Sequence, residues 1–223
     1  MLRMYIGAES LRILRLVWGL FLYAAGIVLT VNANLGVAPW DVFHQGLARL
    51  LGITLGIASI ITSVCIVAIS ALMKEHIGFG TLCNMILIGA FVDMLMLGGI
   101  FPEAQTFAFG FAMLITGLFT LGLASFFYMG AGYGAGPRDS LMVVMTRRTG
   151  RPVGFCRAII EGIALGCGWL LGGKVGVGTV ISAFGIGFSV QMIFTALKFD
   201  VRAIHQETFA ETCSRLKISL KRP

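Results

Sequence analysis

Four long stretches without a charged residue constrain the fold of this chain more than any other feature. They are Leu16–Trp40, Leu50–Met73, Ala104–Pro137 and Val175–Leu197. Each reaches the roughly 20 residues that an α-helix needs to cross the hydrocarbon core of a bilayer. Two more apolar stretches hold few charges: 77–97 contains only Asp93, and 154–173 contains only Arg157 and Glu161. The sequence therefore predicts an all-α integral membrane protein.

Basic residues gather at both ends of the chain and predict its orientation. The N-terminal stretch holds Arg3, Arg12 and Arg15, and the tail from Lys198 onward adds Arg202, Arg215, Lys217, Lys221 and Arg222. Under the positive-inside rule both termini are expected in the cytoplasm. The linker GGIFPEAQ has no Lys or Arg and is expected outside, whereas the linker with Arg147, Arg148 and Arg151 is expected inside.

The net charge of +7 is explained in the same way. Basic residues of a membrane protein set its orientation and contact anionic lipid, so the expected partner is the lipid bilayer and not a nucleic acid. Only 12% of the residues are charged, about half of the share in a soluble domain.

These patterns predict six membrane-spanning helices, at roughly 13–33, 53–73, 77–97, 105–129, 154–173 and 177–197. Two stretches remain, Pro39–Leu51 and Pro137–Gly150. A helix of about 13 residues is only about 20 Å long, which is too short to cross the bilayer. Both stretches also carry charged residues, so they are predicted to be short re-entrant or interfacial half-helices.

The chain is an internal duplication. Pro39 and Pro137 are 98 positions apart, and at this offset the two halves align without a gap. The residues of the first half that have an identical residue 98 positions later include Gly19, Ala33, Gly36, Asp41, Arg49, Gly52, Gly56, Ile61, Gly78, Gly80, Thr81, Ile88, Gly89, Val92 and Met94. The predicted units are repeat 1 (1–98), repeat 2 (99–197) and a basic cytoplasmic tail (198–223).

The number of spans in each repeat decides how the two repeats are related. With three spans and one half-helix each, the repeats enter the membrane from opposite sides and form an inverted repeat, as in many transporters. If the short helices crossed the membrane, there would be eight spans and a parallel repeat. The charges do not exclude this alternative, which would place Arg49 inside and Lys74 outside.

The two Pro-x-Asp motifs at the half-helix N-termini are the first candidate site. Pro39 and Pro137 fit the first turn of a helix, where Asp41 and Asp139 would complement the helix dipole. Gly36, Gly134 and Gly136 would allow the sharp turn before each half-helix. The motif can therefore be a helix cap, a binding site or both, since charges inside a membrane are costly and often mark solute pathways.

Two more residues complete the candidate substrate-binding or ion-binding set of Asp41, Asp139, Arg138 and Glu161. Arg138 could pair with an acid or bind an anion, and Trp40 takes its place in the first repeat. An ion pair with Arg157 four residues earlier is a sufficient structural explanation of Glu161, and coupling of transport to protons is the functional alternative.

Neither an enzyme nor a metal site is indicated. The motifs GxSxG, HExxH and the Walker lysine are absent, and His44, His76 and His205 are scattered along the chain. We expect no catalytic residues, no metal and no cofactor. Gly162, Gly166, Gly172 and Gly176 have the small-xxx-small spacing of close helix packing, within the protein or in a homo-oligomer.

The stretches NANLGVAPWDVFHQGLA, GAGYGAGPRDSLMVVMTRRTG and VGVGTVISAFGIGFSVQ resemble the YczE/YitT family of bacterial multi-pass membrane proteins, with the YczE branch the more similar. The resemblance extends to about Leu197 and implies a location in the bacterial inner membrane. It assigns no catalytic residue and no substrate.

We therefore expect a transporter of a small solute or ion, with a site at the interface of the repeats. The alternative is a non-transporting accessory or scaffold protein that supports a biosynthetic or signalling complex. A membrane enzyme is a more distant third possibility.

Overall fold

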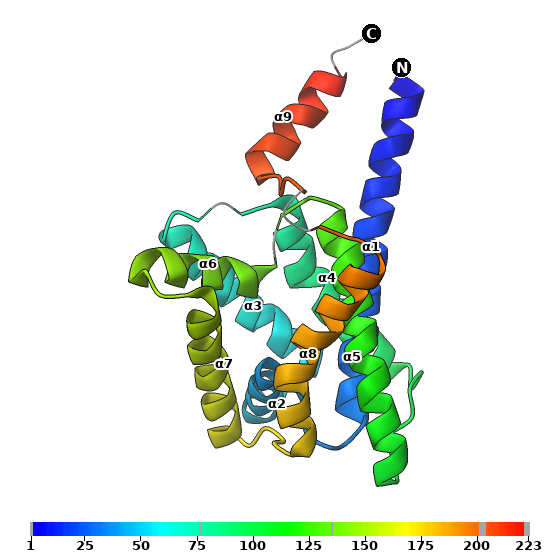
Figure 1. The fold of residues 1–223 in the computed structure, drawn as a ribbon, viewed down its shortest axis with the longest axis vertical. Helices are drawn as coiled ribbons and strands as arrows, with labels where there is room; N and C mark the ends of the chain where they lie inside the picture. Colours follow the sequence, from blue (N-terminus) through cyan, green and yellow to red (C-terminus); the bar gives the residue numbers. More distant parts are fainter. Residues whose placement is uncertain (1, 76, 135, 201–203, 221–223) are drawn as a thin grey trace.

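The protein is all-helical in the part of the chain that the structure describes (Figure 1). The structure, a computed structural model, describes residues 2–75, 77–134, 136–200 and 204–220, without the side chains of residues 2–8 and 216–220. Its helices are α1 (Leu2–Asn32), α2 (Pro39–Leu51), α3 (Leu55–Leu72), α4 (Phe79–Leu97), α5 (Phe107–Gly130), α6 (Pro137–Thr149), α7 (Val153–Leu170), α8 (Val177–Ala196) and α9 (Phe209–Leu220).

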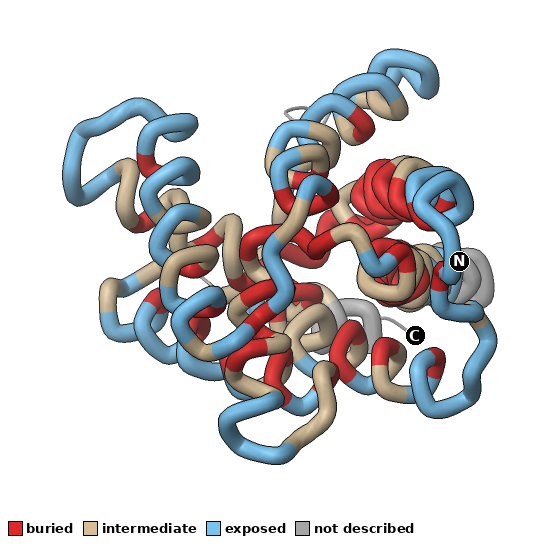
Figure 2. Tube along the Cα trace, turned by 90° about the horizontal axis from the view of Figure 1, so that it is seen from below, coloured by how far each residue is buried: buried red, intermediate tan, exposed pale blue. Residues whose placement is uncertain are grey.

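Six of the described helices are long and apolar enough to cross a membrane, which confirms the expected set of spans. They comprise Glu9–Asn32 of α1 together with α3, α4, α5, α7 and α8. Many large apolar side chains on them are exposed, including Leu72, Leu97 and Phe184. Buried positions lie in the interior and exposed positions around the outside (Figure 2). A bilayer would cover such an apolar surface.

The two short helices begin and end at equivalent residues. α2 starts at Pro39 and α6 at Pro137, each with proline in the first turn. Both end at a glycine in the left-handed conformation, Gly52 (φ 64°) and Gly150 (φ 63°), a usual way to stop a helix. With 13 residues each they are too short to cross a bilayer. α6 lies crosswise to α1 in Figure 1.

The first long helices of the two halves, α1 and α5, pack against each other in opposite directions. A Cβ added to Gly19 would lie 2.6 Å from the backbone nitrogen of Tyr128, and one added to Gly117 would lie 2.7 Å from Thr30. Gly19 and Thr30 are the equivalents of Gly117 and Tyr128, so the two contacts are related by exchange of the halves. An approximate two-fold axis between the halves would produce this arrangement.

The loops before the half-helices show the same exchange. The backbone N–H of Gly80 donates to the carbonyl of Tyr133 at 2.7 Å, and that of Gly178 donates to the carbonyl of Leu35, also at 2.7 Å. Each loop then contains a glycine with positive φ, Gly36 at 97° and Gly134 at 111°. The loop before α6 is thus held by α4 of the first half, and the loop before α2 is held by α8 of the second half.

Contacts at the two ends of the molecule favour the six-span arrangement over the eight-span one. At one end, the side chain of Gln45 accepts a hydrogen bond from the backbone N–H of Lys174 at 3.1 Å. At the other end, Arg147 and Glu75 form an ion pair at 2.9 Å. Eight spans would place Glu75 outside and Arg147, the equivalent of Arg49, inside, so this ion pair could not form. The membrane positions themselves, and the inverted repeat that depends on them, stay predictions.

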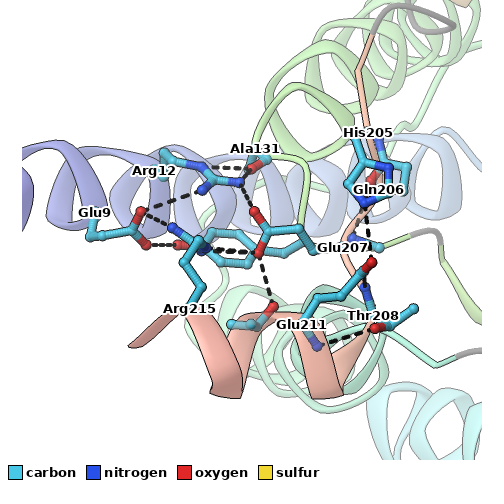
Figure 3. Close-up of polar contacts among 12 residues, drawn as sticks. Glu9, Arg12, Ala131, His205, Gln206, Glu207, Thr208, Glu211 and Arg215 are labelled. Atoms are coloured by element: carbon cyan, nitrogen blue, oxygen red, sulfur yellow. Dashed lines mark hydrogen bonds and ion pairs between the residues drawn. The ribbon is translucent and has the colours of Figure 1, made fainter. Parts of the chain in front are cut away.

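The C-terminal tail docks beside the N-terminal end of α1 (Figures 1 and 3). Arg12 pairs with Glu207 at 3.0 Å, and Arg215 pairs with Glu207 at 3.0 Å and with Glu9. The hydroxyl of Tyr133 donates to Glu9 at 2.8 Å. These five residues, which we call the tail cluster, join the tail to α1 and to the loop before α6.

Tyr133 and Arg215 have shifted pKa values in this cluster. Burial and the hydrogen bond to Glu9 raise the pKa of Tyr133. Burial alone would lower the pKa of Arg215, but hydrogen bonds with Glu9 and Tyr133 and the charge of Glu207 raise it above its ordinary value. Both groups therefore keep their protons at neutral pH.

Backbone contacts continue the attachment of the tail. The N–H of Glu207 donates to the carbonyl of Gly132 at 2.9 Å, and the N–H of Phe209 donates to that of Ile77 at 2.9 Å. The side chain of Gln206 accepts from the N–H of Gly134 at 3.1 Å. Three basic residues of the expected cytoplasmic tail, Arg202, Lys221 and Arg222, lie outside the described residues, as do the side chains of Arg3 and Lys217.

Candidate functional site

A cavity of about 120 Å³ lies where the N-termini of α2 and α6 approach each other. Its walls come from both halves of the chain, and they combine charged, aromatic and small polar side chains. Its lining includes Tyr23, Pro39, Trp40, Ser59, Ser63, Asn84, Tyr128, Gly136, Pro137, Arg138, Asp139, Arg157, Glu161 and Ser182.

Much of the lining consists of equivalent positions, so an approximate two-fold axis between the halves would pass through the cavity. The pairs at an offset of 98 are Pro39 and Pro137, Trp40 and Arg138, Ser59 and Arg157, Ser63 and Glu161, Asn84 and Ser182, and Ile88 and Ile186. The charged lining residues all belong to the second half, whereas the first half supplies aromatic and small polar ones at these positions. The two halves therefore contribute equivalent positions to the cavity but not equivalent charges.

Arg138 and Trp40, which occupy equivalent positions, meet across the axis. The guanidinium carbon of Arg138 lies 5.1 Å from the centre of the Trp40 ring, within range of a cation–π interaction. A guanidinium nitrogen of Arg138 lies 4.0 Å from Oδ1 of Asp41. The difference between the halves at this position thus creates a contact that two identical residues could not make.

The other charged residues of the cavity have hydrogen-bond partners. The hydroxyl of Tyr128 lies 3.2 Å from Oδ2 of Asp139. Arg157 and Glu161 form the expected ion pair, with 2.8 Å between Nε and Oε1. The side chain of Arg157 is 48% exposed, so this pair lies at the open edge of the site.

Asp41, a predicted site residue, lies behind the cavity and does not line it. Its side chain is 5% exposed, and Oδ1 is 3.4 Å from Nδ1 of His44, which is also buried. The guanidinium of Arg138 lies 4.0 Å from the same oxygen, which accepts no hydrogen bond from the described residues. Asp41 therefore contacts a lining residue and is not in position to contact a solute directly.

Arg138, Asp139 and Glu161, the other predicted binding residues, line the cavity together with Pro39, Gly136 and Pro137. Gly36 and Gly134 do not line it. A Cβ on Gly36 would lie 2.5 Å from the backbone nitrogen of Gly176, so this glycine permits close contact between a loop and a helix.

Sequence reasoning missed Tyr23 and Tyr128, whose rings lie 6.2 Å apart beside the cavity. A signal was present, because a tyrosine within an apolar span needs a polar partner for its hydroxyl. The buried contact of His44 with Asp41 was missed as well, although the two residues are one helical turn apart.

Two equivalent pairs of helices lie beside the cavity, α3 with α4 and α7 with α8. The helices of the first pair are in contact at positions where those of the second pair are not. In the first half, a Cβ on Gly89 would lie 2.5 Å from the carbonyl oxygen of Gly56, so α3 and α4 are in close contact. Asp93 bridges them, accepting from the N–H of Gly56 at 2.8 Å and from the hydroxyl of Thr54 at 2.5 Å.

In the second half, the equivalent glycines do not touch. A Cβ on Gly154 or on Gly187 would meet no other described residue within 4 Å. Gln191, the equivalent of Asp93, bonds to Thr195 of its own helix at 3.3 Å. The helices α7 and α8 are therefore separated at the positions where the equivalent helices α3 and α4 are in contact.

Among the described residues, no group of three or more His, Cys, Asp and Glu is arranged to hold a metal ion. The groups that could bind a solute are the guanidinium groups, carboxylates and hydroxyls of the cavity.

Comparisons with known proteins give a family but no activity. Residues 10–195 match the model of a family of unknown function, DUF6198. The chain is 37% identical over 189 residues to the uncharacterized membrane protein YczE of Bacillus subtilis, covering 82% of this chain and 87% of the relative. It is 32% identical over 182 residues to an uncharacterized protein of Haemophilus influenzae, covering 82% and 83%. No solved structure matches it significantly.

Proposed function

We propose a transport function for this chain, which belongs to the DUF6198 family and is a polytopic membrane protein. The transported species is a small polar solute or an ion. It binds in the central cavity, and the cavity opens to one side of the membrane at a time. The proposed location is the bacterial inner membrane, with both termini in the cytoplasm.

The unequal closure of two equivalent helix pairs carries this proposal. Gly56 and Gly89 are in contact, while the identical residues Gly154 and Gly187 are apart. Inverted-repeat transporters alternate by exchanging the conformations of their two repeats. In the opposite state, α7 and α8 would close at Gly154 and Gly187, and α3 and α4 would separate.

The direction of the opening follows from the proposed orientation. α7 begins at Val153, just after the basic linker that is expected inside, so the open side of the cavity faces the cytoplasm. The closed pair includes Thr54 at the start of α3 and Asp93 near the end of α4, and this side faces outward. The described conformation is then the inward-facing state.

Cysteine pairs at equivalent positions test the exchange. In a variant without the native cysteines, Thr54→Cys with Asp93→Cys reports closure of α3 on α4. The matched pair Pro152→Cys with Gln191→Cys occupies the equivalent positions on α7 and α8. Disulfide formation in native membranes is measured for each pair alone, and then in a four-cysteine protein.

The transport proposal predicts that both cysteine pairs form disulfides, because a transporter visits both the state in which α3 and α4 are closed and the state in which α7 and α8 are closed. In the four-cysteine protein, a single molecule is expected to carry either disulfide but not both. If only the 54–93 disulfide forms, or if one molecule carries both, the two sides do not alternate and the transport proposal is wrong.

The alternative function is that of an accessory or scaffold protein, and one observation favours it. Gly162 and Gly166 of α7 have no described residue within 4 Å of an added Cβ, so a helix of a partner or of a second copy could pack there. Such a protein would show the 54–93 disulfide alone.

A further inference from the structure

We infer that the cavity recognises its solute through a carboxylate or phosphate group, with the guanidinium of Arg138 as the principal contact. The inference rests on the proposed transport function, because it names the chemical class of the substrate. What the cavity can bind depends on which of its hydrogen-bonding groups already have partners within the chain.

Arg138 has unused donors. Its guanidinium stacks on Trp40 and lies 4.0 Å from Asp41, and it donates no hydrogen bond to any side chain or carbonyl that the structure describes. A guanidinium has five N–H donors in a planar fork, which matches the two oxygens of a carboxylate or phosphate. Free donors that line a cavity are suited to an acceptor-only group.

Trp40 and Asp41 hold this guanidinium in place. The ring of Trp40 supports one face of the fork, and the buried carboxylate of Asp41 lies on the side away from the cavity. Because the fork is fixed before a ligand arrives, little side-chain entropy is lost on binding. This arrangement explains why a buried acid lies next to the cavity without lining it.

The remaining lining residues agree with an anionic group. Asp139 already accepts from Tyr128, and Glu161 is paired with Arg157. The hydroxyl of Ser182 is fully buried, lines the cavity and has no hydrogen-bond partner within the described chain.

The backbone adds to this preference for an anion. Pro39 and Pro137 place the N-terminal ends of α2 and α6 at the cavity, and these ends carry partial positive charge. The cavity lining therefore presents hydrogen-bond donors that are not used within the described chain, and Oδ1 of Asp41, the unpaired acceptor 4.0 Å from Arg138, is not part of the lining.

Ligand-induced thermal stabilisation of the purified full chain in detergent tests this inference at constant ionic strength. The probes are inorganic phosphate, succinate and, as a cation of similar size, choline. Wild-type protein is expected to be stabilised by phosphate or succinate and not by choline. Arg138→Gln is expected to weaken the binding of that anion by about 10-fold to 100-fold, the usual cost of losing charged hydrogen bonds.

Two further variants separate recognition from folding. Arg138→Lys keeps the charge but not the fork, and is expected to bind with intermediate affinity. Arg148→Gln changes an exposed arginine of the same helix and is expected to bind like the wild type. Stabilisation by choline alone, stabilisation by no probe, or anion binding unchanged in Arg138→Gln would each overturn the inference.

A last arm separates a free solute from a lipid headgroup. Dihexanoyl phosphatidate and glycerol 3-phosphate share the phosphate, and only the first has acyl chains. At least tenfold tighter binding of phosphatidate would identify a lipid headgroup, and equal binding would identify a free solute.

The disulfide experiment needs no ligand, so the two proposals can fail separately. Alternation without anion binding refutes this inference alone, whereas anion binding without alternation refutes transport alone.

Discussion

Gly36 and Gly134 hold the backbone conformation from which each half-helix begins. Both have a positive φ, which a side chain disfavours, and both pack against the backbone of a neighbouring loop or helix. A Cβ on Gly134 would lie 2.7 Å from the Cα of Gly78, which has no flexible side chain to move away. These glycines position the cavity although they do not line it.

Gly134→Ala is therefore expected to destabilise the protein by roughly 2 kcal/mol or more, from backbone strain and the clash together. Thermal unfolding in detergent measures the change. Gly162→Ala is the matched control, because Gly162 lies within a helix and an added Cβ would meet no described residue. We expect the control to be neutral or slightly stabilising, by up to about 1 kcal/mol. Equal unfolding temperatures for Gly134→Ala and wild type would show that the loop is not constrained.

At the same scale, the sequence predicted which residues lie near each other better than how their side chains are oriented. Arg138, Asp139 and Glu161 line the cavity as a site would require, whereas Asp41 lies behind it. The spacing of Pro39 and Asp41 places both in one helical turn but does not determine which way α2 is rotated. That rotation depends on packing against α7, where Gly168 lies against Phe43. Such contacts between distant residues have no local pattern in the sequence.

At the scale of elements, the tail was the least predictable part. Sequence reasoning expected a basic cytoplasmic tail, and α9 has no long apolar stretch that would reveal a docking site. Its attachment comes from the tail cluster, in which residues 9 and 215 meet although they are far apart in the chain. Charges that pair over such distances can be recognised only once the fold brings the two ends together.

The tail cluster predicts that Glu207 holds the tail on the membrane domain. Glu207→Ala removes the partner of Arg12 and Arg215, and is expected to cost about 1–3 kcal/mol of tail docking because the carboxylate is largely buried. Limited proteolysis should then cut the tail at least several-fold faster. Glu211→Gln is the control, since Glu211 is half exposed, its ion pair is with the exposed His205, and glutamine can still accept the hydrogen bond from the backbone N–H of Thr208. Equal cleavage rates in the two variants would contradict a role of the cluster in docking.

For the whole molecule, hydropathy was sufficient to place the six apolar helices, because a bilayer imposes a length and a composition that each span must satisfy. The offset of 98 also aligned the ends of the short helices, at Gly52 and Gly150. Hydropathy could not reveal that α3 packs on α4 while Gly154 and Gly187 stay apart. Identical glycines occur in both halves, so the glycines alone do not determine which pair is closed, and the bridging Asp93 has Gln191 as its equivalent.

The inverted relation of the halves is the central claim, because alternation of equivalent helix pairs depends on it. Arg49 and Arg147 occupy equivalent positions near the C-terminal ends of α2 and α6, and both are exposed. Single cysteines at these two positions, in a variant without native cysteines, can be labelled in intact cells with a membrane-impermeant maleimide. We predict that Arg49→Cys is labelled from outside, and that Arg147→Cys is labelled only after the membrane is permeabilised. Labelling of both positions from the same side would mean a parallel repeat and would contradict the account.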